Sequence, residues 1–344
     1  MKSYLLAAAG LVLLASALTK GDEPVPIPMD TLQANLDISK IPVGLDRERP
    51  VPKDNPLTTE KVSLGRKLFF DPILSGDNTV SCASCHQPAH GFAAPEKLAR
   101  GFKNRTGTRN APSLLNRAYG KAFFWDGREN SLEAQALHPI ASAQEMGSSV
   151  ADAVARLQSH SQYPGQFKMA FADGVTSENL ARALASFERV LLSGNTRVDR
   201  FRAGEVASLT DSETHGFWLY ESRGRCWRCH TGPNFTNEGF HNSGVGSGMT
   251  SADTGRYQVT KLESDRGRFK TPTLRGLAMT GPYMHDGGMA TLEEVVEFYS
   301  QGGKKNANLD PILEPLNLSK SDMLDLVAFL KALSENSARP STLK

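Results

Sequence analysis

All four cysteines of the chain fall in two short motifs of the same form, and this feature constrains the fold more than any other. The motifs are Cys82-Ala83-Ser84-Cys85-His86 and Cys226-Trp227-Arg228-Cys229-His230. Paired cysteines in a secreted protein usually form disulfides, and closely spaced pairs also bind zinc or act as redox dithiols. None of these uses requires a histidine directly after the second cysteine. With 8 histidines in 344 residues, a chance histidine after both motifs has a probability of roughly one in two thousand.

Covalent attachment of c-type haem explains the histidine. The two thiols add to the vinyl groups of the haem, and the adjacent imidazole is thereby held in place to ligate the iron. Disulfides and zinc sites remain the alternatives. The predicted attachment residues and iron ligands are Cys82, Cys85 and His86 for the first haem and Cys226, Cys229 and His230 for the second.

The net charge of the chain bears on its partners, and the apolar N-terminal segment bears on its location. Lys and Arg number 39 against 37 Asp and Glu, a formal net charge of +2, so bulk charge does not favour nucleic acid or anionic membranes. Residues 1–17 place Lys2 before an apolar run that ends at the small residues Ala15-Ser16-Ala17. This pattern predicts a cleaved signal peptide, a periplasmic location and no stable membrane insertion, with an uncleaved anchor as the alternative.

One internal duplication organises the rest of the chain. Leu57-Thr58 precedes Gly65 and the first motif, and Leu209-Thr210 precedes Gly216 and the second motif. Each set predicts a capped helix whose glycine lets it pack closely against another helix. We therefore expect a mainly α fold with two cytochrome c-like domains, each with one covalently bound haem. After an N-terminal extension over 18–56, the domains are predicted to span 57–195 and 196–344.

Three further helices are predicted, one from apolar periodicity and two from capping residues, whereas strand signals are few. Leu180, Leu184, Phe187 and Leu191 predict a helix that Gly194-Asn195 ends. Capping residues predict two more helices near the C-terminus, over 291–300 and 319–333.

Further motifs make the chain resemble the bacterial di-haem cytochrome c peroxidase and MauG family over nearly all of its mature length. These motifs are Arg109-Asn110-Ala111-Pro112, Phe124-Trp125-Asp126-Gly127-Arg128, Glu145-Met146, Pro272-Thr273-Leu274-Arg275 and Gly281-Pro282-Tyr283-Met284-His285-Asp286-Gly287. The resemblance implies that the haem on His86 binds peroxide and that the haem on His230 handles electrons. It implies that Trp125 is an electron bridge between them, although an aromatic residue at such a position could also be simple core.

The resemblance also implies a calcium ion between the domains. Its ligands would be Asn110 and the backbone oxygens of Thr280 and Pro282, which are the hard oxygen donors that calcium prefers.

Two departures from the family pattern bear on the chemistry. Ordinary di-haem peroxidases carry a histidine ligand in the loop that here reads Leu98-Ala99-Arg100-Gly101-Phe102. Arg100 falls at its position and, being permanently charged, does not ligate iron. His90 lies only four residues after His86 and is expected beside the haem edge. The first haem is therefore expected to be open to peroxide without prior reduction.

The second departure is Tyr299, which falls where the peroxidases carry a methionine ligand. The helix over 291–300 places Leu292, Val295, Val296 and Tyr299 on one face. A methionine ligand raises the potential of a haem, whereas an anionic phenolate donates charge and favours higher oxidation states. Such a ligand is typical of MauG. Met279, Met284 and Met289 are the competing ligands.

Glu145 is the candidate general acid and base for peroxide, with a helix-capping or surface carboxylate as the alternative. Pro139 resembles the family position that crowds the peroxide pocket. These residues predict a hydrogen peroxide-dependent oxidoreductase that passes through a high-valent di-haem state. Its partner would be a protein with an oxidisable aromatic residue, as in MauG, or a small cytochrome or cupredoxin that donates electrons for peroxide disposal. A passive di-haem electron carrier is the third hypothesis.

Overall fold

The computed structural model describes residues 38–248 and 252–334 of the 344-residue chain. The predicted signal peptide and the first part of the predicted extension lie outside the described residues. The eleven α-helices of the described part are α1 (Thr59–Phe70), α2 (Cys82–Cys85), α3 (Leu132–Ala141), α4 (Val150–Ser159), α5 (Tyr163–Ala170), α6 (Ser177–Glu188), α7 (Arg197–Arg202), α8 (Asp211–Glu221), α9 (Tyr257–Thr260), α10 (Leu292–Ser300) and α11 (Lys320–Ala332). Within these residues, no helix combines the length and hydropathy needed to cross a bilayer.

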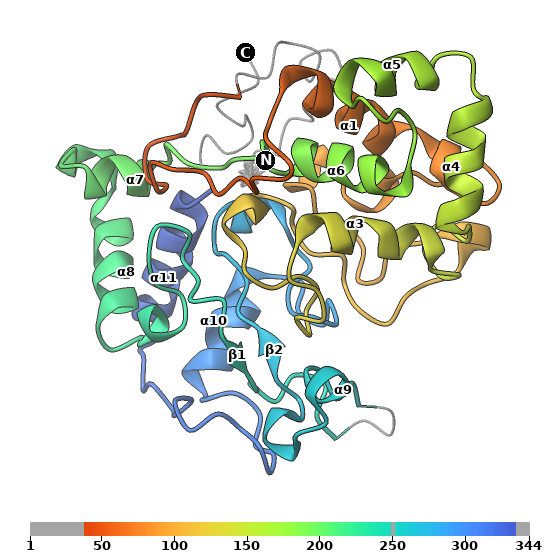
Figure 1. The fold of residues 1–344 in the computed structure, drawn as a ribbon. Coiled ribbons are helices and arrows are strands. Elements are labelled where there is room, and N and C mark those ends of the chain that lie inside the picture. Colours follow the sequence, from red (N-terminus) through yellow and green to blue (C-terminus); the bar gives the residue numbers. More distant parts are fainter. Residues whose placement is uncertain (1–37, 249–251, 335–344) are drawn as a thin grey trace, which may run out of the picture.

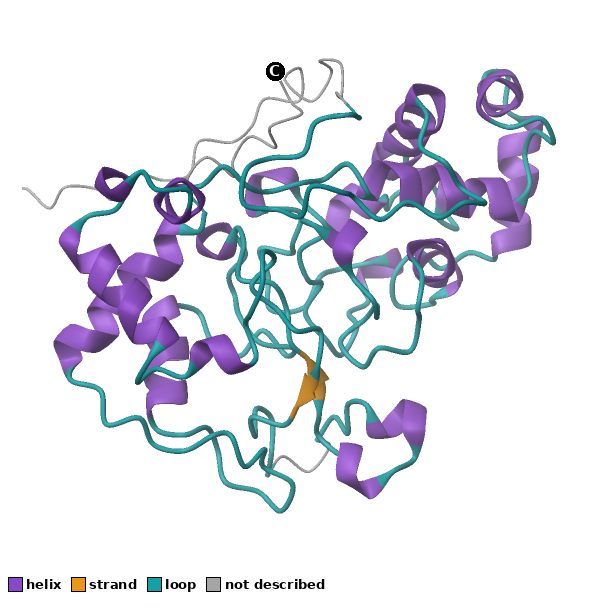
Figure 2. Cartoon of the chain, turned by 60° about the vertical axis from the view of Figure 1, so that its left-hand side comes forward, coloured by secondary structure: helices purple, strands orange, loops and turns teal. Residues whose placement is uncertain are grey.

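Strands contribute little to the fold. In the described residues β1 (Phe240–His241) pairs with β2 (Phe269–Lys270) in one short antiparallel ladder. Helices and long loops account for nearly everything else (Figure 2), which confirms the prediction of a mainly α protein.

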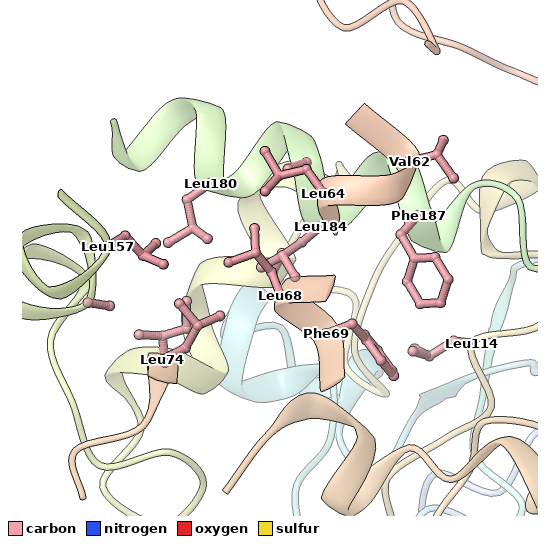
Figure 3. Close-up of a cluster of buried hydrophobic side chains, with 14 of the residues drawn as sticks. Val62, Leu64, Leu68, Phe69, Leu74, Leu114, Leu157, Leu180, Leu184 and Phe187 are labelled. Atoms are coloured by element: carbon pink, nitrogen blue, oxygen red, sulfur yellow. The ribbon is translucent and has the colours of Figure 1, made fainter. Parts of the chain in front are cut away.

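The buried hydrophobic residues form two large clusters that follow one another along the chain. The first extends from Val62 to Leu191, and the second from Val198 to Leu333. In Figure 1, α1 and α3 to α6 gather on one side of the molecule, and α7, α8, α10 and α11 on the other. Figure 3 shows side chains of the first cluster meeting between α1 and α6.

Each cluster contains a close helix crossing at one of the two glycines of the duplication. A Cβ atom on Gly65 of α1 would lie 1.9 Å from the carbonyl oxygen of Ala183 in α6. A Cβ atom on Gly216 of α8 would lie 2.0 Å from the carbonyl oxygen of Asp325 in α11. Backbone at that distance leaves no room for any side chain, so the expectation that these glycines permit close packing is confirmed.

The Gly216→Ala variant should therefore lose stability. Because the obstructing atom is backbone, α8 and α11 must move apart, and overpacking of this kind typically costs about 1–3 kcal/mol in the free energy of unfolding. Denaturant unfolding of the haem-loaded protein measures the change. Gly165→Ala in α5 is the matched control, since nothing lies within 4 Å of its Cβ position. The control should be neutral or stabilised by about 0.5–1 kcal/mol; equal stability of Gly216→Ala and the wild type would contradict the close crossing.

Helix starts agree with the predicted capping residues. Thr210 with Glu213, Thr291 with Glu294, and Ser319 with Asp322 all form reciprocal capping boxes.

The predicted end of α6 is wrong, because the helix ends at Glu188 and not at Gly194. Beyond the helix, the backbone of Ser193 forms its hydrogen bonds with the side chain of Asn116. The Asn116 amide donates to the Ser193 carbonyl oxygen at 2.9 Å, and the Asn116 side-chain oxygen accepts from the Ser193 N–H at 2.8 Å. Leu191 remains buried outside the helix, which is why the apolar periodicity continues past its end.

Within the described residues, each half of the chain contains a turn of the same kind followed by a capped helix. Antiparallel bridges join Phe123 to Glu129 and Tyr283 to Met289. The helices that follow these turns, α3 and α10, begin with the caps Ser131 and Thr291. The two turn-helix units thus occupy equivalent places in the duplication.

Candidate active site

The histidines of the two motifs have the same hydrogen-bonding geometry. Nδ1 of His86 donates to the carbonyl oxygen of Phe92 at 3.0 Å, and Nδ1 of His230 donates to that of Phe235 at 3.1 Å. A carbonyl only accepts, so the proton lies on Nδ1 and the lone pair of Nε2 is available to a metal. Burial lowers the pKa of both imidazoles, that of His230 to about 4, which keeps them neutral as iron ligands must be.

No disulfide joins any two of the four cysteines. Burial raises the pKa of Cys82 and Cys226 to about 12, and that of Cys85 and Cys229 to about 11. The described residues contain no group of three or more His, Cys, Asp or Glu side chains that could hold a metal, as a zinc site requires. Uncharged sulfur atoms beside a neutral imidazole fit thioether attachment of haem.

A cavity of about 290 Å³ opens beside the second motif. Cys226, Cys229 and His230 form part of its wall, and Val296 and Leu330 belong to its largely apolar remainder. Cofactor sites are typically concave, mostly apolar cavities with a few polar groups in the wall. The donor set and the cavity therefore fit a c-type haem.

Tyr299 reaches this cavity from α10, together with Val295 and Val296. The pKa of Tyr299 is raised to about 12, mainly by burial; a hydrogen bond with Ser243 acts in the opposite direction, and Cys229 and Cys226 add to the rise.

The three competing methionines separate in the structure. Met284 also lines the cavity, whereas Met279 packs against the first hydrophobic cluster. Met289 pairs with Tyr283 in the turn before α10. Met284 is thus the one member of the three found in the cavity wall.

Pro139 occupies the place in α3 that Tyr299 occupies in α10. Each residue lies seven positions after the first residue of its helix, Leu132 in α3 and Leu292 in α10. Proline has no side-chain atom that can ligate iron, whereas tyrosine has an oxygen. The equivalent helix positions therefore carry a potential iron ligand in α10 and none in α3.

Glu145 lies close enough to the first motif for its charge to raise the pKa of both the Cys82 and the Cys85 thiol. Burial raises the pKa of its carboxyl group, and the charges of Arg128 and His138 act in the opposite direction. A partly buried carboxyl group with a raised pKa suits general acid and base chemistry.

The turn that carries Glu145 is tied to its neighbours through the backbone. The N–H of Met146 donates to the oxygen of Pro139 at 3.1 Å, and the N–H of Phe102 donates to the oxygen of Glu145 at 2.7 Å. The loop with Arg100 is thereby held beside Glu145. Arg100 itself is exposed and forms an ion pair with Glu96 at 3.5 Å, so its side chain faces solvent.

Trp125 and the three predicted calcium ligands line the same cavity as the second motif. The indole N–H of Trp125 donates to the carbonyl oxygen of Asn110 at 2.9 Å, and its ring meets His285 edge-on at 6.4 Å. The side-chain amide of Asn110 donates to backbone oxygens of Glu96 and Lys97, which leaves its oxygen as an acceptor. Asn110, Thr280 and Pro282 thus line one cavity, and their role as calcium ligands stays a prediction.

Comparison with known proteins places these features in one family. A family model described as di-haem cytochrome c peroxidase matches residues 59–207. The methylamine utilization protein MauG of Methylorubrum extorquens is 39% identical over 311 residues, covering 90% of this chain and 88% of the relative. The chain belongs to the di-haem cytochrome c peroxidase family.

Other members are similar over comparable lengths. The cytochrome c551 peroxidase of Nitrosomonas europaea is 36% identical over 289 residues, covering 83% of each chain. The crystal structure of a MauG-like protein associated with microbial copper homeostasis has a TM-score of 0.81 and 32% identity, covering 88% of this chain and 97% of that one. Membership establishes a di-haem, peroxide-dependent oxidoreductase that acts with a redox partner or a substrate protein, and it overturns the passive-carrier hypothesis.

Two sets of functional residues in this di-haem peroxidase were not predicted from the sequence. The carbonyls of Phe92 and Phe235 orient the motif histidines, and a phenylalanine shortly after each motif was the available signal. Arg117, Glu238 and Lys270 form a buried charge cluster that no sequence pattern indicates, because its members are far apart in the chain.

Proposed function

We propose that this di-haem peroxidase uses hydrogen peroxide to oxidise a partner protein in the MauG manner. In this proposal His86 would hold a haem that is accessible to peroxide, and His230 and Tyr299 would both hold the second haem. The observation that carries the proposal is the equivalence of α3 and α10, which have Pro139 and Tyr299 at the same position.

The proposal divides the chain into two cytochrome c-like domains, over 57–195 and 196–344. The division is supported by the two hydrophobic clusters, since each contains residues around one motif and the first ends before Val198. Cys82 packs against the first cluster and Cys226 against the second.

When bound, the first haem supplies the iron at which the oxygen–oxygen bond of peroxide is cleaved. Glu145 would accept a proton from peroxide and return it to the departing oxygen. Pro139, tied to the Glu145 turn through Met146, limits what can enter beside it. Arg100 stays in solvent and leaves the approach without a competing ligand.

As a ligand of the second haem, the phenolate oxygen of Tyr299 would donate charge and disfavour a reduced resting state. Trp125 would carry electrons between the two haems. A calcium ion held by Asn110, Thr280 and Pro282 would fix the Asn110 carbonyl that accepts the Trp125 indole N–H. In this proposal calcium would therefore help to hold the Trp125 indole in position.

The proposed partner is a periplasmic protein with an oxidisable aromatic residue. Peroxide disposal with a small cytochrome or cupredoxin as donor is the second candidate, favoured by the similarity to the cytochrome c551 peroxidase of Nitrosomonas europaea. Addition of peroxide to the oxidised protein, without any reductant, tests the main proposal. A near-infrared charge-resonance band is expected, and a need for prior reduction would favour the second candidate.

Exchange with either partner is expected to pass through Trp227, which lies between the attachment cysteines and is 46% exposed. Trp227→Phe should slow oxidation of a protein partner at least about tenfold, because phenylalanine is harder to oxidise than tryptophan, while the reaction with peroxide stays unchanged. Stopped-flow mixing measures both steps. Trp218→Phe is the control, since Trp218 is 56% exposed on α8 but lies outside the motif; equal slowing in both variants would contradict the assigned route.

A further inference from the structure

Three buried charged side chains meet where the two halves of the chain adjoin. Arg117 donates to Glu238 through Nη1 at 2.9 Å, and Lys270 donates to the same carboxylate through Nζ at 3.3 Å. The side chains of Arg117, Glu238 and Lys270 are 10%, 8% and 8% exposed. The cluster is thus withdrawn from bulk water.

The charges of the cluster do not balance. Burial alone would raise the pKa of Glu238, but the charges of Arg117 and Lys270 lower it to about 2, so Glu238 is ionised at neutral pH. Among the described residues, Glu238 is the one carboxylate to which either cation donates a hydrogen bond. Arg117 and Lys270 therefore share one carboxylate. Burial and the charge of Arg117 lower the pKa of Lys270 to about 7, although Glu238 acts in the opposite direction, so Lys270 is only partly protonated at neutral pH unless a further anion lies beside it. Buried charge without a partner is costly, so an additional anion would stabilise this arrangement.

Glu188 does not supply that anion. It is 6% exposed, its charge reaches Arg117, and its Oε2 has no hydrogen-bond partner in the described structure. Burial raises its pKa to about 8, with Arg189 and Arg117 acting in the opposite direction, so it is mostly protonated at neutral pH.

The excess charge faces the cavity beside the second motif. Arg117 and Lys270 both line this cavity. Arg275 lines it as well, but Asp199 holds the Arg275 guanidinium with two hydrogen bonds of 2.8 Å and balances its charge. Arg225 is paired with Glu314 at the exposed rim. The buried wall around Arg117 and Lys270 thus fits a carboxylate on whatever fills the cavity, and haem carries two carboxylates.

We propose that Arg117 and Lys270 form a two-cation subsite that binds a carboxylate of the haem attached at Cys226 and Cys229, and that Lys270 raises the reduction potential of this haem. The N–H of Lys270 also donates to the carbonyl oxygen of Trp125 at 2.8 Å, so one residue anchors both the bridge and the haem. The inference rests on the second haem of the proposed function but not on the identity of the partner or substrate.

Lys270→Met tests the subsite through the reduction potentials of the haem-loaded protein. Loss of a cation beside the haem stabilises the more positive ferric form. The ferric-to-ferrous ratio of the second haem at a fixed potential should rise at least tenfold, which is 59 mV for a one-electron couple. The first haem should be unchanged. Spectroelectrochemical titration measures both couples, and haem content is checked for each variant.

Two variants serve as matched controls. Lys270→Arg keeps the charge and should return the ratio to within about threefold of the wild type. Lys331→Met removes an exposed lysine of α11 that pairs with Glu293, and it should move neither couple. An unmoved second couple in Lys270→Met, or the same shift in Lys270→Arg, would overturn the inference.

Glu238→Gln provides a test of sign that stands even if Lys270→Met fails to fold. Removing the shared anion adds positive charge to the cluster, so the second couple should shift toward the ferrous form, opposite to Lys270→Met. A shift toward the ferric form or no shift would overturn the subsite. If wild-type protein gives no peroxide band without reductant but these shifts occur, the proposed function fails and the subsite stands. If the peroxide band forms without reductant but the potential shifts are absent, the proposed function stands and the subsite fails.

Discussion

Replacing Tyr299 by methionine should abolish the near-infrared band that peroxide produces in the oxidised protein, while both haems remain attached. The thioether favours the reduced state of a haem, whereas the phenolate it replaces stabilises oxidised states. The second haem of the variant should accordingly be reduced at a higher potential. Absorption from the visible to the near-infrared after mixing with peroxide measures the first effect, and redox titration the second.

Tyr257→Phe is the control for this experiment. Tyr257 lies in α9, outside the cavity lining, so the band should keep its wild-type intensity. Survival of the band in Tyr299→Met would contradict ligation by Tyr299. Met284, which lines the same cavity, would then be the next candidate.

Glu145→Gln should slow the reaction of the resting protein with peroxide by a factor of about 10²–10⁴, the usual contribution of a positioned general acid and base. The amide keeps the size of the side chain but does not take up the proton. Burial raises the pKa of the Glu145 carboxyl group, so the active, deprotonated form is lost as the pH falls through that raised value. The wild-type rate should decline on that acidic limb, and the variant should lack the limb.

Stopped-flow rates measured across the acidic pH range test both parts of this expectation. Glu178→Gln is the control, since Glu178 is an exposed residue of α6 paired with Arg182. Its rates and pH profile should match the wild type. A Glu145→Gln variant with a wild-type rate at all pH values would exclude the proton-transfer role.

Local signals in the sequence were sufficient for much of the fold. Capping residues such as Thr291 and Ser319 mark helix starts correctly because the cap bonds involve only neighbouring residues. Gly65 and Gly216 indicated close helix crossings because no other residue leaves that space. The motifs predict both haem sites from five consecutive residues each, and membership of a di-haem family agrees with two haems.

Long-range contacts account for what the sequence did not predict. The end of α6 depends on the side chain of Asn116, far from the helix in the chain. The charge cluster joins Arg117 to Glu238 and Lys270 across the two halves of the fold. Periodicity and spacing do not report such contacts.

Electron paramagnetic resonance of the oxidised protein tests the central claim most directly. A free coordination position at His86 and an oxygen ligand at His230 predict one high-spin and one low-spin ferric signal in equal amounts. Two low-spin signals, with every axial position of both haems filled, would contradict the account.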